Sequence, residues 1–437
     1  MRIAFIIAGA ADMYCGSCLR DNLLANELHS LGEDITVVPA YTPVRVDGET
    51  LVGKRVFFGA IDVYLQEKFP GLRERGGLVG KLLGSQALLG WISRFALSTN
   101  PAELGRLTLS ILRGKEGHQR RSLRELVEWL ARDVRPDVVH LPNSLFLGFA
   151  REIKERLGVP VVCGLSGEDV FLDGLVEPYR SKALELMRER AGDVDRYTAT
   201  TRYCAERMTE MVGLDAARVD VVLPGVNLQD YTAARGSHES KESRDGLVIG
   251  YFARIAPEKG LHLLANAYQR ILSSGEFPGV RLRIAGYLGG KERRYAASVR
   301  RTLAAHKVVN SVELFGTVDR QDKLAFLRGL DVFSVPTVTP EPKGLFVLEA
   351  LASGVPVVQP RHGAFPELLE HTGGGLLHEP GDAADLAAKL RELLGSRERR
   401  LELGESGREA VHARFSSSRM AEDTLAVYRK VVGNGVS

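Results

Sequence analysis

The chain has 437 residues, of which 44% are hydrophobic, so it is too long for one simple domain and has enough apolar material for two cores. Its 58 Lys and Arg against 55 Asp and Glu leave a formal net charge of +3, a near balance that disfavours a nucleic-acid-binding protein. No apolar run approaches the about 20 residues that a membrane span needs, and the four cysteines are too few for a disulfide-stapled secreted protein. We therefore expect a soluble, cytoplasmic protein of two domains.

Short apolar runs alternate with helical patterns through the first half of the chain. The runs lie at residues 3–8, 35–39, 137–141, 159–163 and 219–223. This alternation is typical of an α/β protein whose parallel sheet is covered by helices. We predict a Rossmann-like N-terminal domain over residues 1–240.

A helical insertion is expected near residues 65–130 of this domain. Within it, residues 78–97 are largely apolar, with Lys81, Trp91 and Arg94 interspersed. The pattern favours an amphipathic helix packed on its own domain. A helix lying on the membrane surface remains the alternative, and with it peripheral contact with the inner membrane surface.

Two cysteines flank a Gly-Ser pair directly after the first predicted strand, as Cys15-Gly16-Ser17-Cys18. A helix N-terminus lowers the pKa of a thiol, so a redox role is one interpretation. A zinc site would need about four ligands, and only this one pair is clustered. We expect a plain loop in which Gly16 matters and the cysteines pack or touch substrate.

The sequence changes character at residues 232–246, which are small, polar and charged, as an exposed linker is. Beyond it the alternation restarts. The new apolar runs lie at residues 247–252, 280–285, 312–315, 332–335 and 355–358. We predict a second Rossmann-like domain over residues 241–415, and a C-terminal helix at 416–437 that is free to cross back to the first domain. Two such sheets would face a central cleft, where open α/β sheets bind ligands.

A loop and helix precede the last of these runs, in the segment TPEPKGLFVLEALASG at residues 339–354. Pro340 and Pro342 keep the loop extended, and Gly344 permits close approach of the backbone to a ligand. The helix expected at residues 345–352 begins at this loop. Its N-terminus offers unpaired N–H groups and about half a positive charge, which suits a diphosphate.

Two carboxylates bracket this helix start, Glu341 before it and Glu349 two turns into it. This spacing, with Gly344 between them, resembles the signature of the retaining glycosyltransferases of family 4, which have the two-domain GT-B fold. Residues 250–260, GYFARIAPEKG, are similar to the element with which that family opens its C-terminal domain. Further likeness runs through residues 222–227, 284–286 and 312–318.

The resemblance implies roles for particular residues. Glu341, Arg254 and Lys259 are the implied catalytic residues, the last two matching the family's phosphate-binding pair. The implied donor-binding set is Gly16, Arg254, Lys259, Glu341, Lys343, Gly344, Leu345, Phe346 and Glu349. In it Glu349 binds the ribose hydroxyls and Glu341 the transferred sugar. Two cations near a helix N-terminus offset the charge of a leaving nucleotide diphosphate, so we expect no metal and no cofactor beyond the nucleotide diphosphate sugar substrate.

The sequence departs from the family pattern at two places. Lys343 stands where many members have an aromatic residue, and residues 165–169 read LSGED where many have a His-Gly pair. Glu168 or Asp169 is predicted to bind an acceptor or donor hydroxyl instead. His140 lies at the end of the predicted strand at residues 137–141 and His362 just before Gly363, and we interpret both as hydrogen-bonded structural histidines.

The predicted function is retaining transfer of a sugar from a nucleotide diphosphate donor to a saccharide, lipid or small-metabolite acceptor, as in glycan biosynthesis. The family resemblance implies that retention arises from attack by the acceptor on the same face from which the nucleotide leaves. A sugar-nucleotide epimerase or a phosphorylase on the same fold is one alternative, and a non-catalytic sugar-nucleotide-binding protein is another. The motifs do not specify the base, the sugar, the acceptor or the oligomeric state.

Overall fold

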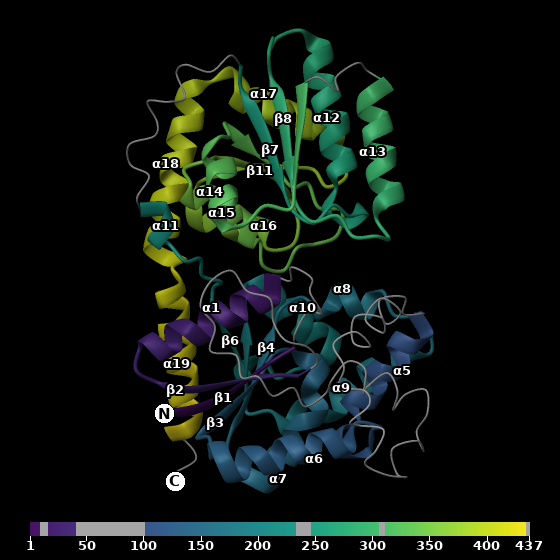
Figure 1. The fold of residues 1–437 in the computed structure, drawn as a ribbon, viewed down its shortest axis with the longest axis vertical. Coiled ribbons are helices and arrows are strands. Elements are labelled where there is room, and N and C mark those ends of the chain that lie inside the picture. Colours follow the sequence, from purple (N-terminus) through teal and green to yellow (C-terminus); the bar gives the residue numbers. More distant parts are fainter. Residues whose placement is uncertain (9–15, 41–100, 233–245, 306–310, 434–437) are drawn as a thin grey trace, which may run out of the picture. The chain divides into compact units, whose positions relative to one another are not determined.

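The computed structural model describes residues 1–8, 16–40, 101–232, 246–305 and 311–433 (Figure 1). The chain divides into two compact units, Met1–Leu223 with Met420–Ser437, and Pro224–Arg419. Each unit contains one six-stranded sheet, which confirms the prediction of an α/β protein with two parallel-sheet domains. Residues 78–97 of the expected insertion lie outside the described residues.

The first sheet has the strand order β2-β1-β3-β4-β5-β6, and every neighbouring pair is parallel. Its strands are β1 (Arg2–Ile7), β2 (Asp34–Pro39), β3 (Val138–Leu141), β4 (Val161–Leu165), β5 (Arg196–Ala199) and β6 (Val219–Val221). The sequence analysis missed β5, because a four-residue strand reading RYTA carries too few apolar residues to stand out.

Alternate side chains of β1 enter different cores, as the two-residue period of a strand requires. Ile3 and Phe5 belong to one apolar cluster, and Ala4 and Ile6 to another. Both faces of the sheet are therefore covered, which explains why the strand reads as a continuous apolar run. Fully burying each such large aliphatic side chain stabilises the fold by about 1.5–3 kcal/mol.

The α-helices that the structure describes in this unit divide between the two clusters. They are α1 (Gly16–Ser30), α5 (Pro101–Leu112), α6 (Arg120–Trp129), α7 (Ala150–Leu157), α8 (Glu168–Asp173), α9 (Tyr179–Arg190), α10 (Arg202–Val212) and α19 (Ser417–Gly433). Leu24 and Leu28 of α1 share the Ile3 cluster with Leu425 and Tyr428 of α19. The last helix of the chain thus packs on the same core as the first strand (Figure 1).

The second sheet has the order β12-β11-β10-β7-β8-β9 and is also parallel. Its strands are β7 (Val248–Phe252), β8 (Arg281–Ala285), β9 (Val312–Gly316), β10 (Val332–Phe333), β11 (Val357–Pro360) and β12 (Gly375–His378). The sequence analysis missed β12, which is four residues long and begins with glycine. Its helices are α11 (Gln229–Thr232), α12 (Leu261–Ser274), α13 (Arg293–Ala305), α14 (Arg320–Arg328), α15 (Leu345–Ala352), α16 (Phe365–Thr372), α17 (Ala383–Gly395) and α18 (Arg397–Arg414).

The strand order of the second sheet reverses at β7, the first strand of the unit. The chain runs outward through β8 and β9 on one side, and β10 lies on the other. Loops that leave adjacent parallel strands at such a switch point diverge, and this is where open α/β sheets bind ligands. The loops after β7, β10 and β11 therefore define the place to look for a site.

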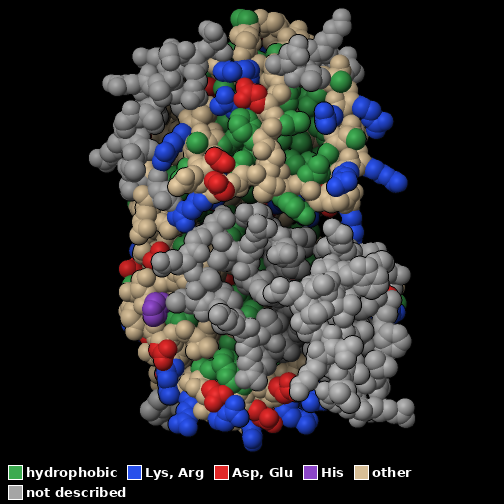
Figure 2. All heavy atoms as spheres, viewed as in Figure 1, with side chains coloured by type: hydrophobic (Ala, Val, Ile, Leu, Met, Phe, Trp, Pro, Cys, Tyr) green, Lys and Arg blue, Asp and Glu red, His purple; other side chains and the backbone are tan. Residues whose placement is uncertain are grey.

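The surface of the second unit carries charges of both signs, interspersed over the face seen in Figure 2. This distribution agrees with the near balance of acidic and basic residues. Among the helices that the structure describes, none has the length and apolarity to cross a membrane.

Candidate functional site

The loops after β7 and β10 touch through their backbones. Gly260 has a φ of +71°, and a Cβ added to it would lie 1.7 Å from the carbonyl oxygen of Pro336. Only glycine fits there, because both the left-handed backbone and the lack of space exclude a side chain. The amide of Val338 also donates to the carbonyl of Glu258 at 2.9 Å. These contacts fix the loop that carries Lys259 against the loop that leads to Glu341.

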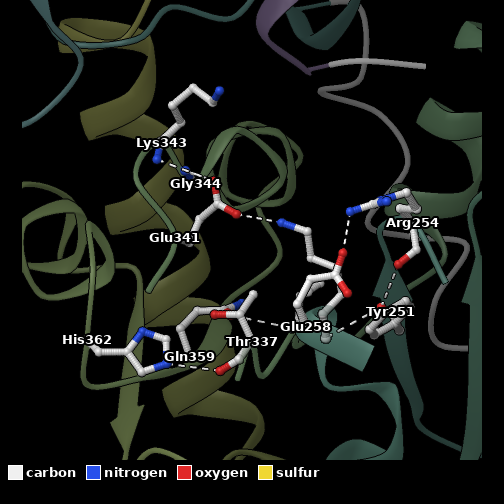
Figure 3. A network of polar contacts seen from close by, with 11 residues as sticks. Tyr251, Arg254, Glu258, Thr337, Glu341, Lys343, Gly344, Gln359 and His362 are labelled. Atoms are coloured by element: carbon white, nitrogen blue, oxygen red, sulfur yellow. Dashed lines mark hydrogen bonds and ion pairs between the residues drawn. The ribbon is translucent and has the colours of Figure 1, made fainter. Parts of the chain in front are cut away.

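An ion pair joins the two loops. Lys259 Nζ lies 2.6 Å from Glu341 Oε2, and the Glu341 side chain is buried. The other carboxylate oxygen, Oε1, accepts from the amides of Lys343 at 3.3 Å and Gly344 at 3.5 Å (Figure 3). The ammonium also lies 5.5 Å from the centre of the Phe346 ring. The structure thus brings together five residues that the sequence singled out.

The environment of Glu341 determines its charge. Burial by itself would raise the pKa of this carboxyl group, but attraction to the Lys259 ammonium and the hydrogen bond from it outweigh burial. Lys343 and the Gly344 amide act in the same direction, so the pKa lies below its ordinary value. Glu341 is therefore an ionised acceptor at neutral pH, suited to binding hydroxyl groups.

Arg254 lies on the same loop as Lys259 and pairs with Glu258. The buried Tyr251 anchors this loop, since its hydroxyl donates to the carbonyl of Arg254 at 3.2 Å (Figure 3). The Arg254 side chain is about half exposed, at 47%. A guanidinium has five N–H donors, so Arg254 can keep Glu258 and still bind an anion.

The helix predicted at residues 345–352 is confirmed as α15, Leu345–Ala352. Gly344 is its N-cap with a φ of +65°, and an added Cβ would lie 2.5 Å from Leu368 Cδ1. The glycine therefore permits the sharp entry into the helix. The first amides of α15 consequently lie beside Glu341, where an anion meets the positive end of the helix dipole.

Glu349, in the second turn of α15, has a lysine partner of its own. Lys323 Nζ from α14 lies 2.7 Å from Glu349 Oε1. The sequence analysis missed Lys323, because it lies 26 residues earlier on another helix and no local pattern marks it. Each of the two predicted carboxylates is thus paired with a different cation.

The residues predicted in the first unit are arranged differently. Gly16 is the exposed first residue of α1, and Cys15 lies outside the described residues. Glu168 and Asp169 form the first turn of α8. The Glu168 carboxylate accepts from the amide of Ser166 at 3.0 Å, so it is turned towards its own loop. Burial raises the pKa of Asp169, although Arg207 lies 3.7 Å away.

A buried polar pair occupies the carboxyl end of β3. His140 Nδ1 lies 2.9 Å from the hydroxyl of Tyr428 on α19, and its ring stacks on Phe5 with centroids 4.4 Å apart. Burial, with a contribution from Arg20, lowers the pKa of His140 to about 3. His140 is therefore neutral at physiological pH and has a packing partner on each side, as a structural histidine does.

Within the described part of the chain, Cys18, Cys163 and Cys204 are buried thiols that form no disulfide with one another. No group of three or more His, Cys, Asp or Glu side chains gathers there as metal ligands. The absence of a metal requirement stays a prediction.

Comparison with known proteins identifies the family. The model described as "Glycosyl transferases group 1" matches residues 235–410, and the model described as "Glycosyltransferase Family 4" matches residues 99–230. Together the two models cover more than half of the chain. The protein therefore belongs to the family 4 glycosyltransferases, which have the GT-B fold.

Individual relatives agree with this assignment. The chain is 28% identical to D-inositol 3-phosphate glycosyltransferase of Segniliparus rotundus over 77% of its own length and 72% of the relative. It is 27% identical to a glycogen synthase of Mycobacterium tuberculosis over 68% and 69%.

Two solved structures share the fold. HepE of Anabaena in complex with UDP has a TM-score of 0.68 at 15% identity, over 98% of this chain and 100% of that one. Sucrose-phosphate synthase of Thermosynechococcus elongatus has a TM-score of 0.68 at 17% identity, over 99% of each chain.

Proposed function

We propose that this glycosyltransferase transfers a sugar from a nucleotide diphosphate donor to an acceptor hydroxyl, with retention of configuration and without a metal. The second unit binds the donor and the first unit binds the acceptor. The observation that carries the proposal is the Lys259–Glu341 pair beside the N-terminus of α15, at the switch point of the second sheet.

The diphosphate is assigned to Arg254, Lys259 and the first amides of α15. An ammonium has three N–H donors, so Lys259 can keep its 2.6 Å contact with Glu341 and still donate to a phosphate oxygen. Two cations and a helix N-terminus stabilise the charge that grows on the diphosphate as it leaves. That is the contribution a metal makes in other transferases, and it supports the metal-independent proposal.

The transferred sugar is assigned to Glu341 and the ribose to Glu349. Both carboxylates are held by lysines, Lys259 and Lys323, so each oxygen has a fixed direction. Glu341 accepts hydrogen bonds from sugar hydroxyls in this role. Its contacts with Lys259 and two backbone amides keep it ionised and make it a poor proton carrier.

The transfer step needs no covalent enzyme intermediate. The bond between the anomeric carbon and the diphosphate oxygen breaks, and the acceptor oxygen bonds to the same carbon from the same face. The acceptor proton passes to an oxygen of the leaving diphosphate. The role of this unit is to hold the donor and to stabilise the charge of the leaving group.

The choice of base and acceptor starts from the relatives. UDP is present in the HepE structure, so a uridine donor is the first to test. Relatives are named for inositol phosphate and for glycogen, so soluble polyols, their phosphates and glucans form the acceptor panel. We assign acceptor contact to Asp169 before Glu168, because the Glu168 carboxylate already accepts from Ser166.

The testing experiment is a thermal-shift screen of the purified protein against uridine, guanosine and adenosine diphosphates and their sugars, in chelator. One base should raise the melting temperature, and Glu349→Ala and Arg254→Ala should remove the shift. Lys291→Ala is a matched control, because this exposed lysine lies outside the loops after β7, β10 and β11. The absence of any shift in the wild-type protein would contradict the proposal, as would a shift that requires a divalent cation.

A further inference from the structure

A third loop, which follows β11, is tied to the Glu341 loop through His362. The Nε2 atom of His362 lies 2.9 Å from the carbonyl oxygen of Thr337 (Figure 3). A carbonyl oxygen only accepts, so Nε2 carries the proton and Nδ1 carries the lone pair. The hydrogen bond spans the gap between the loops after β10 and β11.

The residues after His362 touch Glu341 directly. A Cβ added to Gly363 would lie 2.5 Å from the Glu341 amide nitrogen and 2.6 Å from its carbonyl oxygen. The amide of Ala364 donates to that same carbonyl at 2.7 Å. The loop after β11 therefore holds the backbone of Glu341, while His362 holds Thr337, four residues before it.

The three loops form one chain of contacts. The Lys259 loop is bonded to the Thr337 segment through the Val338 amide and the Glu258 carbonyl. The Thr337 segment is hydrogen-bonded to His362. The ion pair between Lys259 and Glu341 is a further link between the first two loops. Removing the His362 contact takes away one of the hydrogen bonds that hold the segment leading to Glu341, and the Val338 and Ala364 bonds remain.

Stability alone does not explain an imidazole at this position. The Nδ1 atom of His362 is buried and has no hydrogen-bond partner among the described residues. A buried acceptor without a partner destabilises the fold, and a well-packed apolar side chain avoids that loss. Because this loss and the Thr337 hydrogen bond act in opposite directions, we expect the His362 side chain to contribute little net stability, and its main effect to be on the position of the loop.

We propose that His362 is a positioning residue for sugar transfer, which acts by holding the Thr337 segment so that Glu341 stays aligned beside Lys259. The proposal rests on the function proposed above, because it assigns His362 an effect on the step in which Glu341 binds the sugar. The hydrogen bond to Thr337 agrees with the expected structural role of His362, and the proposal adds that this role affects the position of Glu341.

Three substitutions at one position test the proposal. His362→Gln places an amide N–H close to the position of Nε2 and can still donate to Thr337. His362→Asn is shorter, so its amide falls near Nδ1 and does not reach, and His362→Leu has no donor. We expect His362→Asn and His362→Leu to lower kcat by about tenfold to a hundredfold, with the donor KM changed less than about threefold. His362→Gln should keep kcat within about threefold of the wild-type value.

The controls separate position from stability. All variants should melt within a few degrees of the wild-type protein. His371 lies on α16 with its ring against Phe415, and His371→Gln should retain full activity. Equal activity in all three variants would overturn the proposal, as would His362→Gln being as impaired as His362→Leu, or losses that follow the melting temperature. If the wild-type protein turns over no donor, or Glu341→Gln is fully active, it is the proposed function that fails.

Discussion

The charged pairs at the carboxyl edges of the two sheets differ in how far they are exposed to solvent. In the second unit Lys259 and Glu341 form a pair that is 22% and 9% exposed, and a second lysine and carboxylate pair lies nearby on α14 and α15. In the first unit Arg20 donates twice to the neighbouring Asp21, and that pair is only 7% and 3% exposed. The pair in the second unit keeps N–H donors accessible to a ligand, while the pair in the first unit is buried and out of reach of one.

The comparison separates charges that can bind a ligand from charges that hold the fold. A lysine at a part-exposed edge can add a phosphate to its contacts without losing its carboxylate. Arg20 is buried together with Asp21, so a ligand could reach its guanidinium only if the pair separated, and the buried carboxylate left without its partner would be strongly unfavourable. We therefore expect substitutions of the paired charges in the second unit to change catalysis. Substitutions around His140 in the first unit should change the stability of the fold.

The largest expected effect follows from breaking the Lys259–Glu341 pair. Lys259→Ala should lower kcat by about 10²-fold to 10³-fold, because it removes a cation aimed at the leaving diphosphate. Glu341→Gln should lower kcat as well, and the double variant should lose less than the product of the two single losses, since the residues share one interaction. Steady-state kinetics on the four proteins measures this coupling, and strictly multiplicative losses would show that the pair does not act as a unit.

An intermediate effect concerns the stability of the first unit in acid. His140 has a pKa of about 3 in the folded protein, below its ordinary value of about 6.5, so between these values the unfolded state binds more protons. Its contribution to stability is complete above pH 6.5 and is lost as the pH falls towards 3. The loss is at most about 1.4 kcal/mol per pH unit.

Denaturant unfolding at several pH values measures this effect. His140→Gln keeps a hydrogen-bonding group but does not titrate, so its free energy of unfolding should fall less steeply than that of the wild-type protein below pH 6. If the free energies of unfolding of the two proteins fall equally steeply with pH, the prediction is wrong, because His140 then binds its proton equally well in the folded and the unfolded state. Transfer activity at pH 7.5 should change little in this variant, in contrast to the Lys259 variants.

The smallest expected effect comes from the hydroxyl of Tyr428 on α19. Tyr428→Phe removes the 2.9 Å contact with His140 Nδ1 and leaves that buried atom without its partner, so we expect a loss of about 1–3 kcal/mol. The melting temperature should fall by several degrees while kcat and the donor KM stay unchanged. A fall in kcat without a fall in melting temperature would contradict the division between the two units.

Several features follow from the sequence because they rest on local chemistry. The helix at residues 345–352 was predicted with the bounds the structure shows, since Gly344 before it and Gly354 after it mark its ends. The other strands were found from their apolar runs, while β5 and β12 were missed because RYTA and GLLH contain no run of more than two apolar residues. The resemblance to family 4 also follows from local patterns, namely the spacing of Glu341, Gly344 and Glu349 together with the segment at residues 250–260.

Only the tertiary structure decided which polar and charged side chains are partners. Lys259 and Glu341 are 82 residues apart, and Tyr428 and His140 are 288 apart, so no local pattern pairs them. The strand order of the second sheet brings Lys259 and Glu341 together, because loops that leave adjacent parallel strands start at the same edge. The packing of α19 on the core of the first sheet brings Tyr428 to His140. The sequence therefore determined the elements and the family, and the packing of the strands decided that Lys323 faces Glu349 and that His362 holds Thr337.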